Sequence, residues 1–394
     1  MKILFVVDAR SPIAVNWIRH FVERGDEIYI ASTFAASLAL PVTRMETIPV
    51  AFSGLKKATQ RPGAASARTL GLRTVIRQWL GPLTIRRAAK QLRAFIGEAQ
   101  PDLIHAMRIP YEGMIAANAI DGLHTPSVSA PLRSGRLIIS TWGNDFTLHA
   151  PSSPLMRQYT RRTMQRADAV HSDCHRDIRL ATEWGFDSAK PTLVAPGNGG
   201  IHTDIFCPPA KLVEAPIILN PRGFRPYVRN DMFFKSIPLV LAKHPNAKFL
   251  CASMAGEVEA IRRIRELGIE DSVELLGLVP HEQTAEVYRR AQILVSPSIH
   301  DGTPNTLLEG MACGCFPVAG DLESIREWIS PNENGLLFDS NDPQSIASAL
   351  IEAIENKTLR EKSARLNRDV ISMRAEYGNN MRNAEGFYKR VIDN

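Results

Sequence analysis

Two acidic residues eight positions apart, Asp301 and Glu309, bracket a segment with the features of a helix start. Thr303 occupies the place expected of an N-cap and Pro304 the first helical position, where proline's missing N–H costs nothing. The first amides of a helix have few intrahelical acceptors and lie at the positive end of its dipole, which creates an anion site; here they belong to Asn305, Thr306 and Leu307. At ~1.5 Å per residue, Glu309 stands about 8 Å further along the axis. Phosphate contacts followed by a carboxylate for hydroxyls are typical of a nucleotide-sugar site, and a solvated loop acid with a helix-surface acid is the alternative.

Two arginines follow the strand predicted at Ile217–Asn220. Arg222 leaves this strand at its carboxyl end, and Arg229 lies seven residues later, just before a predicted helix. Guanidinium groups in this place can neutralise a diphosphate, whose charge grows as a glycosidic bond breaks. Arg225 competes with Arg229 for this role, and surface arginines in a loop are the alternative.

Short β-branched runs alternate with amphipathic helical stretches along the chain, which is the pattern of parallel sheets covered by helices on both faces. The pattern restarts after a proline-containing break at residues 206–216. We therefore predict an α/β protein of two Rossmann-like, doubly wound domains facing a central cleft, over residues 1–207 and 208–375. Ligands of such sheets lie beyond the carboxyl ends of the strands. A last helix, at about 376–394, is long enough to pack back on the first domain.

The composition is that of an ordinary soluble protein, with 44% hydrophobic and 22% charged residues, and 394 residues suit two domains. No apolar run approaches the ~18 residues of a membrane helix, and the apolar start of the chain is too short for a signal peptide. Five scattered cysteines indicate a reducing cytoplasm. Cys313 and Cys315 form a CxC without a second group of ligands, so we expect no metal and no cofactor, and helix packing explains the pair.

The positive charge is concentrated in the first half. Residues 1–207 contain 25 Lys and Arg against 16 Asp and Glu, whereas the remainder contains 22 against 25. The stretch Lys56–Arg93 has ten basic residues and no acidic one. Its second half could be the solvated face of a helix, with Arg86, Arg87, Lys90 and Arg93 outward. The equal alternative is peripheral contact with an anionic membrane at its inner face; no nucleic-acid partner is expected.

The sequence resembles a known family in several places. DGTPNTLLEGMACGCFPVAG is similar to the EX7E region of the retaining GT-B glycosyltransferases of family 4, the glycosyl transferases group 1. The pair Arg222 and Arg229 resembles that family's phosphate-binding Arg and Lys. The segments ELLGLVPHEQTAEVYRRAQILVSPS, RADAVHSDCHRD and APGNGGIHTDIFCP also resemble family segments, so that the likeness covers most of the chain from Pro101 onward.

The resemblance implies roles for residues of the second domain. Glu309 would hold the ribose hydroxyls, and Asp301 would replace the family's first Glu near the donor sugar and diphosphate. The phosphates would face the segment Gly302, Thr303, Pro304, Asn305, Thr306 and Leu307. The backbone around Leu278 would meet the base, with Ser253 lining the same pocket.

Three departures from the family pattern concern the same site. Asp301 is one methylene shorter than Glu, and the first strand is followed by DARSPIAVNW without a Gly-Gly loop. STWGNDF stands where many members have HGxD, so that Trp142 replaces the histidine. An indole can stack on a sugar and donate one hydrogen bond but cannot accept a proton. Asp145 is then the first-domain candidate for positioning hydroxyls of the acceptor or donor sugar, beside Asn144, and capping of the next turn is the alternative.

Three further residues are candidates for binding the acceptor. His105 ends the strand predicted at Leu103–Ala106 and would point into the cleft, although histidines in such places are often structural. Arg108 and Glu112 follow in AMRIPYEG and could bind the acceptor or pair with each other.

The family resemblance implies the transfer of a sugar, with retention, from a nucleotide-diphosphate donor of UDP, GDP or ADP type to a hydroxyl of a glycan or lipid-linked acceptor. A donor phosphate oxygen would take the acceptor proton, so no protein nucleophile is required. Two other classes fit the same architecture: a nucleotide-sugar epimerase, which needs no acceptor, and a non-catalytic nucleotide-sugar binding subunit.

Overall fold

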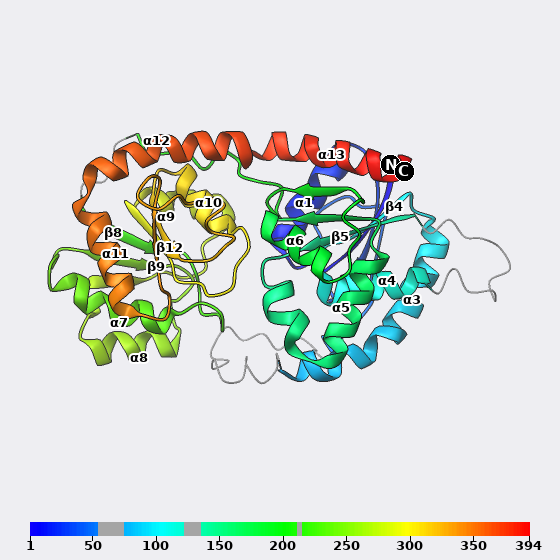
Figure 1. The fold of residues 1–394 in the computed structure, drawn as a ribbon, viewed down its shortest axis with the longest axis horizontal. Coiled ribbons are helices and arrows are strands. Elements are labelled where there is room, and N and C mark those ends of the chain that lie inside the picture. Colours follow the sequence, from blue (N-terminus) through cyan, green and yellow to red (C-terminus); the bar gives the residue numbers. More distant parts are fainter. Residues whose placement is uncertain (54–74, 122–134, 211–214) are drawn as a thin grey trace. The chain divides into compact units, whose positions relative to one another are not determined.

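The computed structural model describes residues 1–53, 75–121, 135–210 and 215–394, which fold into two compact units (Figure 1). The first unit holds the described residues up to Gly200 together with Gly378–Asn394, and the second runs from Ile201 to Tyr377. Each unit contains a parallel sheet with helices, which confirms the predicted fold class. Part of the basic stretch Lys56–Arg93 lies outside the described residues, which begin again at Val75.

The sheet of the first unit has seven parallel strands among the described residues, in the order β3-β2-β1-β4-β5-β6-β7. These are β1 (Lys2–Val7), β2 (Glu27–Ser32), β3 (Arg44–Thr47), β4 (Leu103–Ala106), β5 (Arg136–Thr141), β6 (Ala169–Ser172) and β7 (Thr192–Val194). Its helices are α1 (Pro12–Glu23), α3 (Ile85–Ala99), α4 (Met114–Asp121), α5 (Pro154–Arg166), α6 (His175–Glu183) and α13 (Tyr377–Asp393). The edge strand β3 escaped the sequence prediction because its four side chains are half-buried or exposed and form no apolar run.

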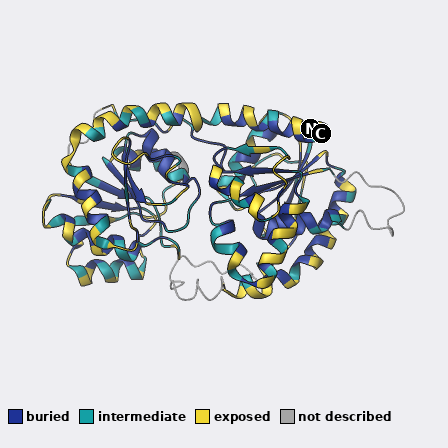
Figure 2. Cartoon of the chain, viewed as in Figure 1, coloured by how far each residue is buried: buried dark blue, intermediate teal, exposed yellow. Residues whose placement is uncertain are grey.

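The sheet of the second unit has six parallel strands among the described residues, in the order β10-β9-β8-β11-β12-β13. These are β8 (Ile217–Asn220), β9 (Lys248–Cys251), β10 (Val273–Leu275), β11 (Ile293–Ser296), β12 (Phe316–Gly320) and β13 (Leu336–Phe338). Its helices are α7 (Asn230–Leu241), α8 (Val258–Leu267), α9 (His281–Arg289), α10 (Asn305–Ala312), α11 (Pro343–Glu355) and α12 (Lys357–Arg374). Figure 2 shows buried strands and helices that alternate buried with exposed residues, as amphipathic helices covering a sheet must.

The strand order reverses once in each sheet. In the first sheet β1 pairs with β2 on one side and with β4 on the other, and in the second β8 pairs with β9 and with β11. The connections leaving such a pair diverge, which opens a crevice at the carboxyl ends of the two strands. The topology therefore predicts that ligands bind near the loops after β1 and β4, and near those after β8 and β11.

No helix in the described ranges combines the length and the apolar character needed to cross a bilayer.

The C-terminal helix α13 belongs to the core of the first unit. Tyr388 of α13 is fully buried, and its ring stacks on Phe21 of α1 with ring centroids 4.6 Å apart. The indole Nε1 of Trp17 donates a hydrogen bond of 2.8 Å to the Tyr388 hydroxyl. The end of the chain is thus bonded to its beginning through buried aromatic side chains.

A chain of buried hydrogen bonds continues from Tyr388 across three strands. The Nε2 atom of His171 lies 3.0 Å from the Ala195 carbonyl, and its Nδ1 lies 2.8 Å from Ser140 Oγ. The Nε2 of His105 lies 2.7 Å from Ser140 Oγ, and its Nδ1 contacts the Tyr388 hydroxyl. Because a carbonyl only accepts, His171 donates to it and accepts from Ser140, which in turn accepts from His105. All these groups are satisfied only while both imidazoles are neutral.

Acid should destabilise the first unit through His171. Burial lowers the pKa of His171 to about 4, whereas an imidazole in an unfolded chain titrates near 6.5. Between these values the unfolded chain binds more protons, so stability decreases as the pH falls from 6.5 to 4, by about 3 kcal/mol for this residue. Urea unfolding at several pH values should show a smaller decrease for His171→Asn than for the natural protein.

The matched control for this prediction is His244→Asn, in the second unit, where the imidazole lies 3.1 Å from Glu355 at a half-exposed position. This variant should keep the acid sensitivity of the natural protein. An equal loss of stability between pH 6.5 and 4 with and without the His171 imidazole would contradict the interpretation.

Candidate functional site

The carboxyl ends of β8 and β11 bring together two of the residues predicted for the site. Arg222 follows β8 and Asp301 follows β11, and the Arg222 Nη2 atom lies 2.8 Å from Asp301 Oδ2. Both side chains are largely buried, with 12% and 15% exposed. The reversal of strand order places their two loops side by side, which is the reason for this contact between residues far apart in the sequence.

The remaining nitrogens of Arg222 are less engaged. Its Nη1 lies 3.5 Å from Thr306 Oγ1, at the limit of a hydrogen bond, and its Nε is buried without a partner in the described part of the chain. A buried N–H that lacks an acceptor costs about 1–3 kcal/mol. An anionic oxygen placed beside this guanidinium would remove that cost and add a charge-assisted bond.

The loop after β8 is fixed by a buried amide pair. Asn220 accepts a bond of 3.0 Å from the backbone N–H of Arg222, and its Nδ2 donates to Asn230 Oδ1 at 2.9 Å. Asn230 in turn donates to the carbonyl of Gly223. These bonds hold the backbone of Arg222 in place from the β8 end to the start of α7.

The start of α10 differs from the sequence prediction by one residue. Pro304, not Thr303, is the N-cap, and it makes no side-chain capping bond. Thr303 is buried, and its hydroxyl accepts a bond of 2.9 Å from Trp328 Nε1. The amide of Leu307 bonds to the Pro304 carbonyl at 2.9 Å, so it is not the free anion donor that the sequence suggested.

Asn305 and Thr306 are then the first two residues of α10, and their amides have no acceptor within the helix. The Oδ1 atom of Asn305 is buried and has no hydrogen-bond partner among the residues that the structure describes. Close packing holds the helix against the sheet, since a Cβ built on Gly310 would lie 2.4 Å from Leu294 Cδ1 of β11. The adjoining Gly302 is buried.

Glu309 lies one turn further along α10, with 8% of its surface exposed. The hydroxyl of Tyr288, at the end of α9, donates a bond of 2.9 Å to Glu309 Oε2. Burial and the neighbouring Glu309 carboxylate raise the pKa of Tyr288 well above its ordinary value, so this phenol remains a donor. Tyr288 was missed in the sequence because it lies on the apolar face of α9, beside Ala285, where a core role is the default.

Arg229 lies near the carboxyl end of β11, where its backbone N–H donates a bond of 2.8 Å to the Pro297 carbonyl. It is the N-cap residue of α7, and its Nε and Nη2 atoms bond to the two carboxylate oxygens of Asp231, each at 2.9 Å. Its third nitrogen, Nη1, contacts Asn341. This bidentate pair lowers the pKa of Asp231. Asp231 thus balances the charge of Arg229, whose predicted diphosphate role stays a prediction; Arg225 is exposed.

Two other residues predicted in the second unit occupy different settings. Ser253 follows β9 with a positive φ of 57°, and its Cβ would lie 3.5 Å from a Cβ built on Gly223. It therefore borders the loop that carries Arg222. Leu278 has 89% of its surface exposed and makes no pocket wall with its side chain; only its backbone remains available for the predicted contact with a base.

In the first unit, Asp145 is completely buried. It accepts a bond of 2.9 Å from Arg108 Nε and bonds of 3.2 Å from the backbone N–H groups of Ile109 and Trp142. Burial raises the pKa of Asp145, and Arg108 partly opposes that rise. Asp145 thus fastens the loop after β5 to that after β4, and the predicted contact with substrate hydroxyls is corrected because its side chain has no exposed surface.

The residues around Asp145 keep groups that could meet a ligand. Arg108 donates to Asn144 Oδ1 at 2.9 Å, and its guanidinium carbon lies 5.5 Å from the centre of the Trp142 ring. The Nε1 of Trp142 is buried and has no partner within the described ranges. An indole N–H of this kind is the single donor that the sequence ascribed to Trp142.

His105 is not at the edge of the sheet. It lies in the core with no exposed surface, between Ser140 and Tyr388, and burial together with His171 lowers its pKa well below the ordinary value. The predicted acceptor role is wrong because the side chain of this β4 residue faces α13 rather than the strand ends. The alternative of a structural histidine is the observed one.

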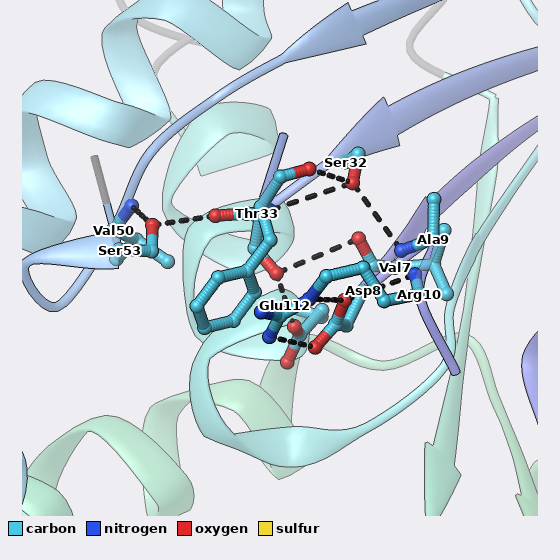
Figure 3. A network of polar contacts seen from close by, with 10 residues as sticks. Val7, Asp8, Ala9, Arg10, Ser32, Thr33, Val50, Ser53 and Glu112 are labelled. Carbon is cyan, nitrogen blue, oxygen red and sulfur yellow. Dashed lines mark hydrogen bonds and ion pairs between the residues drawn. The ribbon is translucent and has the colours of Figure 1, made fainter. Parts of the chain in front are cut away.

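A polar network that the sequence did not indicate lies at the carboxyl ends of β1 and β2 (Figure 3). Arg10 and Asp8 form an ion pair at 2.8 Å, and the Arg10 guanidinium carbon lies 3.5 Å from the centre of the Phe34 ring. Glu112, which follows β4, accepts a bond of 2.7 Å from Thr33 Oγ1, and burial raises its pKa. The sequence Asp8-Ala9-Arg10, directly after the first strand, could have indicated this network.

One group of described residues could bring three metal ligands together. Ligand atoms of Asp173, Cys174 and Asp177, at the start of α6, lie within 4.8 Å of one another. The guanidinium of Arg176 pairs with Asp177 at 2.7 Å, so a cation already balances this carboxylate. Burial raises the pKa of the Cys174 thiol, which opposes the thiolate that a metal requires.

Comparison with known proteins gives two matches that together span most of the chain. The family described as Glycosyl transferase 4-like domain matches residues 12–197, and Glycosyl transferases group 1 matches residues 204–370. The first match lies in the first structural unit, and the second lies in the unit that holds Arg222, Asp301 and Glu309.

Individual relatives are distant. A D-inositol 3-phosphate glycosyltransferase of Thermobispora bispora is 25% identical over 209 residues, which are 48% of this chain and 48% of that protein. A phosphatidyl-myo-inositol mannosyltransferase of Mycobacterium leprae is 22% identical over 71% of this chain and 83% of its own length. The first of these matches thus spans about half the length of the relative.

Similarity in structure extends over the whole chain. The Anabaena protein HepE, solved in complex with UDP, superposes with a TM-score of 0.72 at 14% identity, over 99% of this chain and 100% of its own. This likeness concerns the fold of two doubly wound units.

Proposed function

Because the chain belongs to the glycosyl transferases group 1, a family with the GT-B fold, we propose that it transfers a sugar from a nucleoside-diphosphate donor to a hydroxyl of a glycan or lipid-linked acceptor. The donor is assigned to the second unit and the acceptor to the first. Anabaena HepE was solved with UDP, and the Mycobacterium leprae relative is named for a phosphatidylinositol acceptor, which supports a donor of UDP type and a lipid-linked acceptor without deciding either.

The observation that carries this proposal is the guanidinium of Arg222. It stands at the crevice between β8 and β11 with a buried Nε that has no partner in the described part of the chain, beside the first amides of α10. A diphosphate could accept hydrogen bonds from the Arg222 guanidinium and from the first amides of α10. Glu309 lies one turn further on the same helix, where it would meet the ribose hydroxyls of a nucleoside attached to the diphosphate.

The chemistry follows from where charge develops. As the bond between sugar and diphosphate breaks, negative charge collects on the leaving diphosphate, and Arg222 with the α10 amides would stabilise it. We propose a reaction with retention, in which a donor phosphate oxygen takes the proton of the attacking hydroxyl. Asp301 would orient both the Arg222 guanidinium and the donor sugar, and Trp142 and Asn144 would position the acceptor through an N–H and an amide.

No metal is required in this scheme, since the guanidinium and amides supply the positive charge. The five cysteines among the described residues are all unpaired, which supports a cytoplasmic setting as part of the proposal.

The proposal is tested first by binding. The melting temperature is measured with UDP, GDP and ADP in turn. The diphosphate that matches the site, at about 100 times its Kd, should stabilise the folded protein by ~2.7 kcal/mol and raise the melting temperature by about 5–10 °C. Incubation with the corresponding nucleotide sugar, alone and with candidate acceptors, then separates the classes. A transferase forms a new glycoside only with acceptor present, an epimerase alters the donor without it, and a binding subunit does neither. Absence of stabilisation by all three diphosphates would contradict the proposal.

A further inference from the structure

Large apolar side chains are concentrated on one outer face of the first unit. Residues 75–80 are helical and lead into a single turn at Gly81–Thr84, directly before α3. Five of the eleven large hydrophobic side chains exposed in the described ranges lie here, within nine consecutive positions: Val75, Ile76, Trp79, Leu80 and Leu83. Trp79 is 55% and Leu83 67% exposed, whereas Gly81 and Pro82 between them are buried.

Contacts with other elements of the first unit hold this stretch in place. The carbonyl of Gln78 accepts a bond of 2.8 Å from Ser153 Oγ, and that of Arg77 is bonded by the Tyr111 hydroxyl. The Arg77 guanidinium carbon lies 5.4 Å from the centres of the Phe34 and Tyr111 rings. Because bonds to fixed elements hold the turn, the outward position of its apolar side chains is built into the fold.

The adjoining start of α3 carries positive charge. Arg86, Arg87 and Lys90 are the exposed residues of the first turns of α3, and the sequence has no acidic residue between Ser53 and Glu98. Leu83 and Arg86 also border a hollow of about 340 Å³ that α5 closes with Leu155, Tyr159 and Arg162. Apolar and basic side chains are therefore interleaved on one patch.

We propose that this patch, Val75–Leu83 with Arg86, Arg87 and Lys90, docks on an anionic lipid bilayer. Trp and Leu side chains partition into the boundary between head groups and acyl chains, while Arg and Lys bind lipid phosphates. A basic fringe around an apolar centre matches the charge of such a surface, and Arg86, Arg87 and Lys90 form no ion pair with other described residues. The inference deepens the proposed function by naming the surface from which a lipid-linked acceptor would come, although docking itself needs no sugar transfer.

Vesicle flotation with the full chain tests the docking patch. We compare vesicles of phosphatidylcholine with vesicles that also contain about 30% phosphatidylglycerol. The natural protein should float with the anionic vesicles at low salt. It should dissociate from them at ~0.5 M salt, because salt screens exposed charges. Trp79→Ser with Leu83→Ser should lower the partition coefficient at least about tenfold, and Arg86→Gln, Arg87→Gln and Lys90→Gln together on the order of a hundredfold.

Matched controls come from the second unit. Val258→Ser with Met373→Ser removes two side chains that are 64% and 73% exposed, and Lys362→Gln, Arg365→Gln and Arg368→Gln remove three exposed charges of α12. Both controls should float as the natural protein does. Stabilisation by the matching nucleoside diphosphate, measured on every variant, should stay unchanged, so that a failure of docking is distinguished from a failure of the donor site.

The proposal is overturned if the folded natural protein stays with neither kind of vesicle, or if the two patch variants bind as well as their controls. A dimer in solution that Trp79→Ser with Leu83→Ser converts to a monomer, without any vesicle binding, would assign the patch to a second copy of the chain instead.

Discussion

Arg222→Ala is expected to reduce the turnover number by about two to three orders of magnitude, the usual effect of removing one preorganised donor from a charge that develops during reaction. The guanidinium lies at the crevice of the second sheet with a buried Nε that lacks a partner in the described part of the chain. Arg225→Ala, three residues away at an exposed position, is the matched control and should change turnover less than about twofold. Steady-state kinetics with the donor identified by thermal shift provide the measurement.

Loss of folding is separated from loss of catalysis by two observations on the same variants. Removal of Arg222 leaves Asp301 without its partner at 2.8 Å, so the melting temperature of Arg222→Ala must be recorded beside its kinetics. Arg222→Lys keeps the charge without the fork geometry and should lie between the two. Equal small effects of Arg222→Ala and Arg225→Ala on turnover would remove Arg222 from the site.

Glu309→Ala should weaken donor binding about 10–100-fold, because a carboxylate bonded to hydroxyls contributes roughly 1.5–3 kcal/mol. Its oxygen also accepts the bond from the Tyr288 hydroxyl, so Tyr288→Phe serves as the control for disturbed packing. That variant keeps the carboxylate and should weaken binding much less. Titration calorimetry with the nucleoside diphosphate distinguishes the two, and a folded Glu309→Ala variant with unchanged affinity would refute the ribose assignment.

Contacts that depend on strand order could be predicted from the sequence. The strands β8, β11 and β12 of the second sheet are apolar runs in the sequence. Parallel strands with a reversal of order must bring the loops after β8 and β11 together. The ion pair of Arg222 with Asp301 is a consequence of that topology. The same pattern predicted both doubly wound units, although it missed the polar edge strand β3.

The partner that an individual side chain binds, and the side of the sheet that it faces, could not be predicted from the sequence. Nothing in the residue pattern indicated that Arg229 forms a bidentate ion pair with Asp231, two residues away. His105 lies near the end of β4, and its side chain could face either side of the sheet. In the fold it faces Tyr388 of α13, almost three hundred residues later in the sequence. In both cases the outcome depended on local geometry that residue types and spacing do not contain.

The shorter acid at position 301 is compatible with the proposed role. Ser324 Oγ donates a bond of 2.7 Å to the Asp301 carbonyl, which holds the loop, while the carboxylate meets Arg222. The one-methylene side chain of Asp301 is therefore long enough to reach the Arg222 guanidinium. We therefore expect Asp301 to act on the donor sugar as a pair with Arg222.

The central claim is that the crevice between β8 and β11 binds the diphosphate of the donor. A crystal structure with the nucleoside diphosphate that stabilises the protein tests this most directly. We expect its phosphate oxygens within hydrogen-bonding distance of the Arg222 guanidinium and of the Asn305 and Thr306 amides, and its ribose hydroxyls on Glu309. A diphosphate bound elsewhere, with the Nε of Arg222 still lacking an acceptor, would contradict the account.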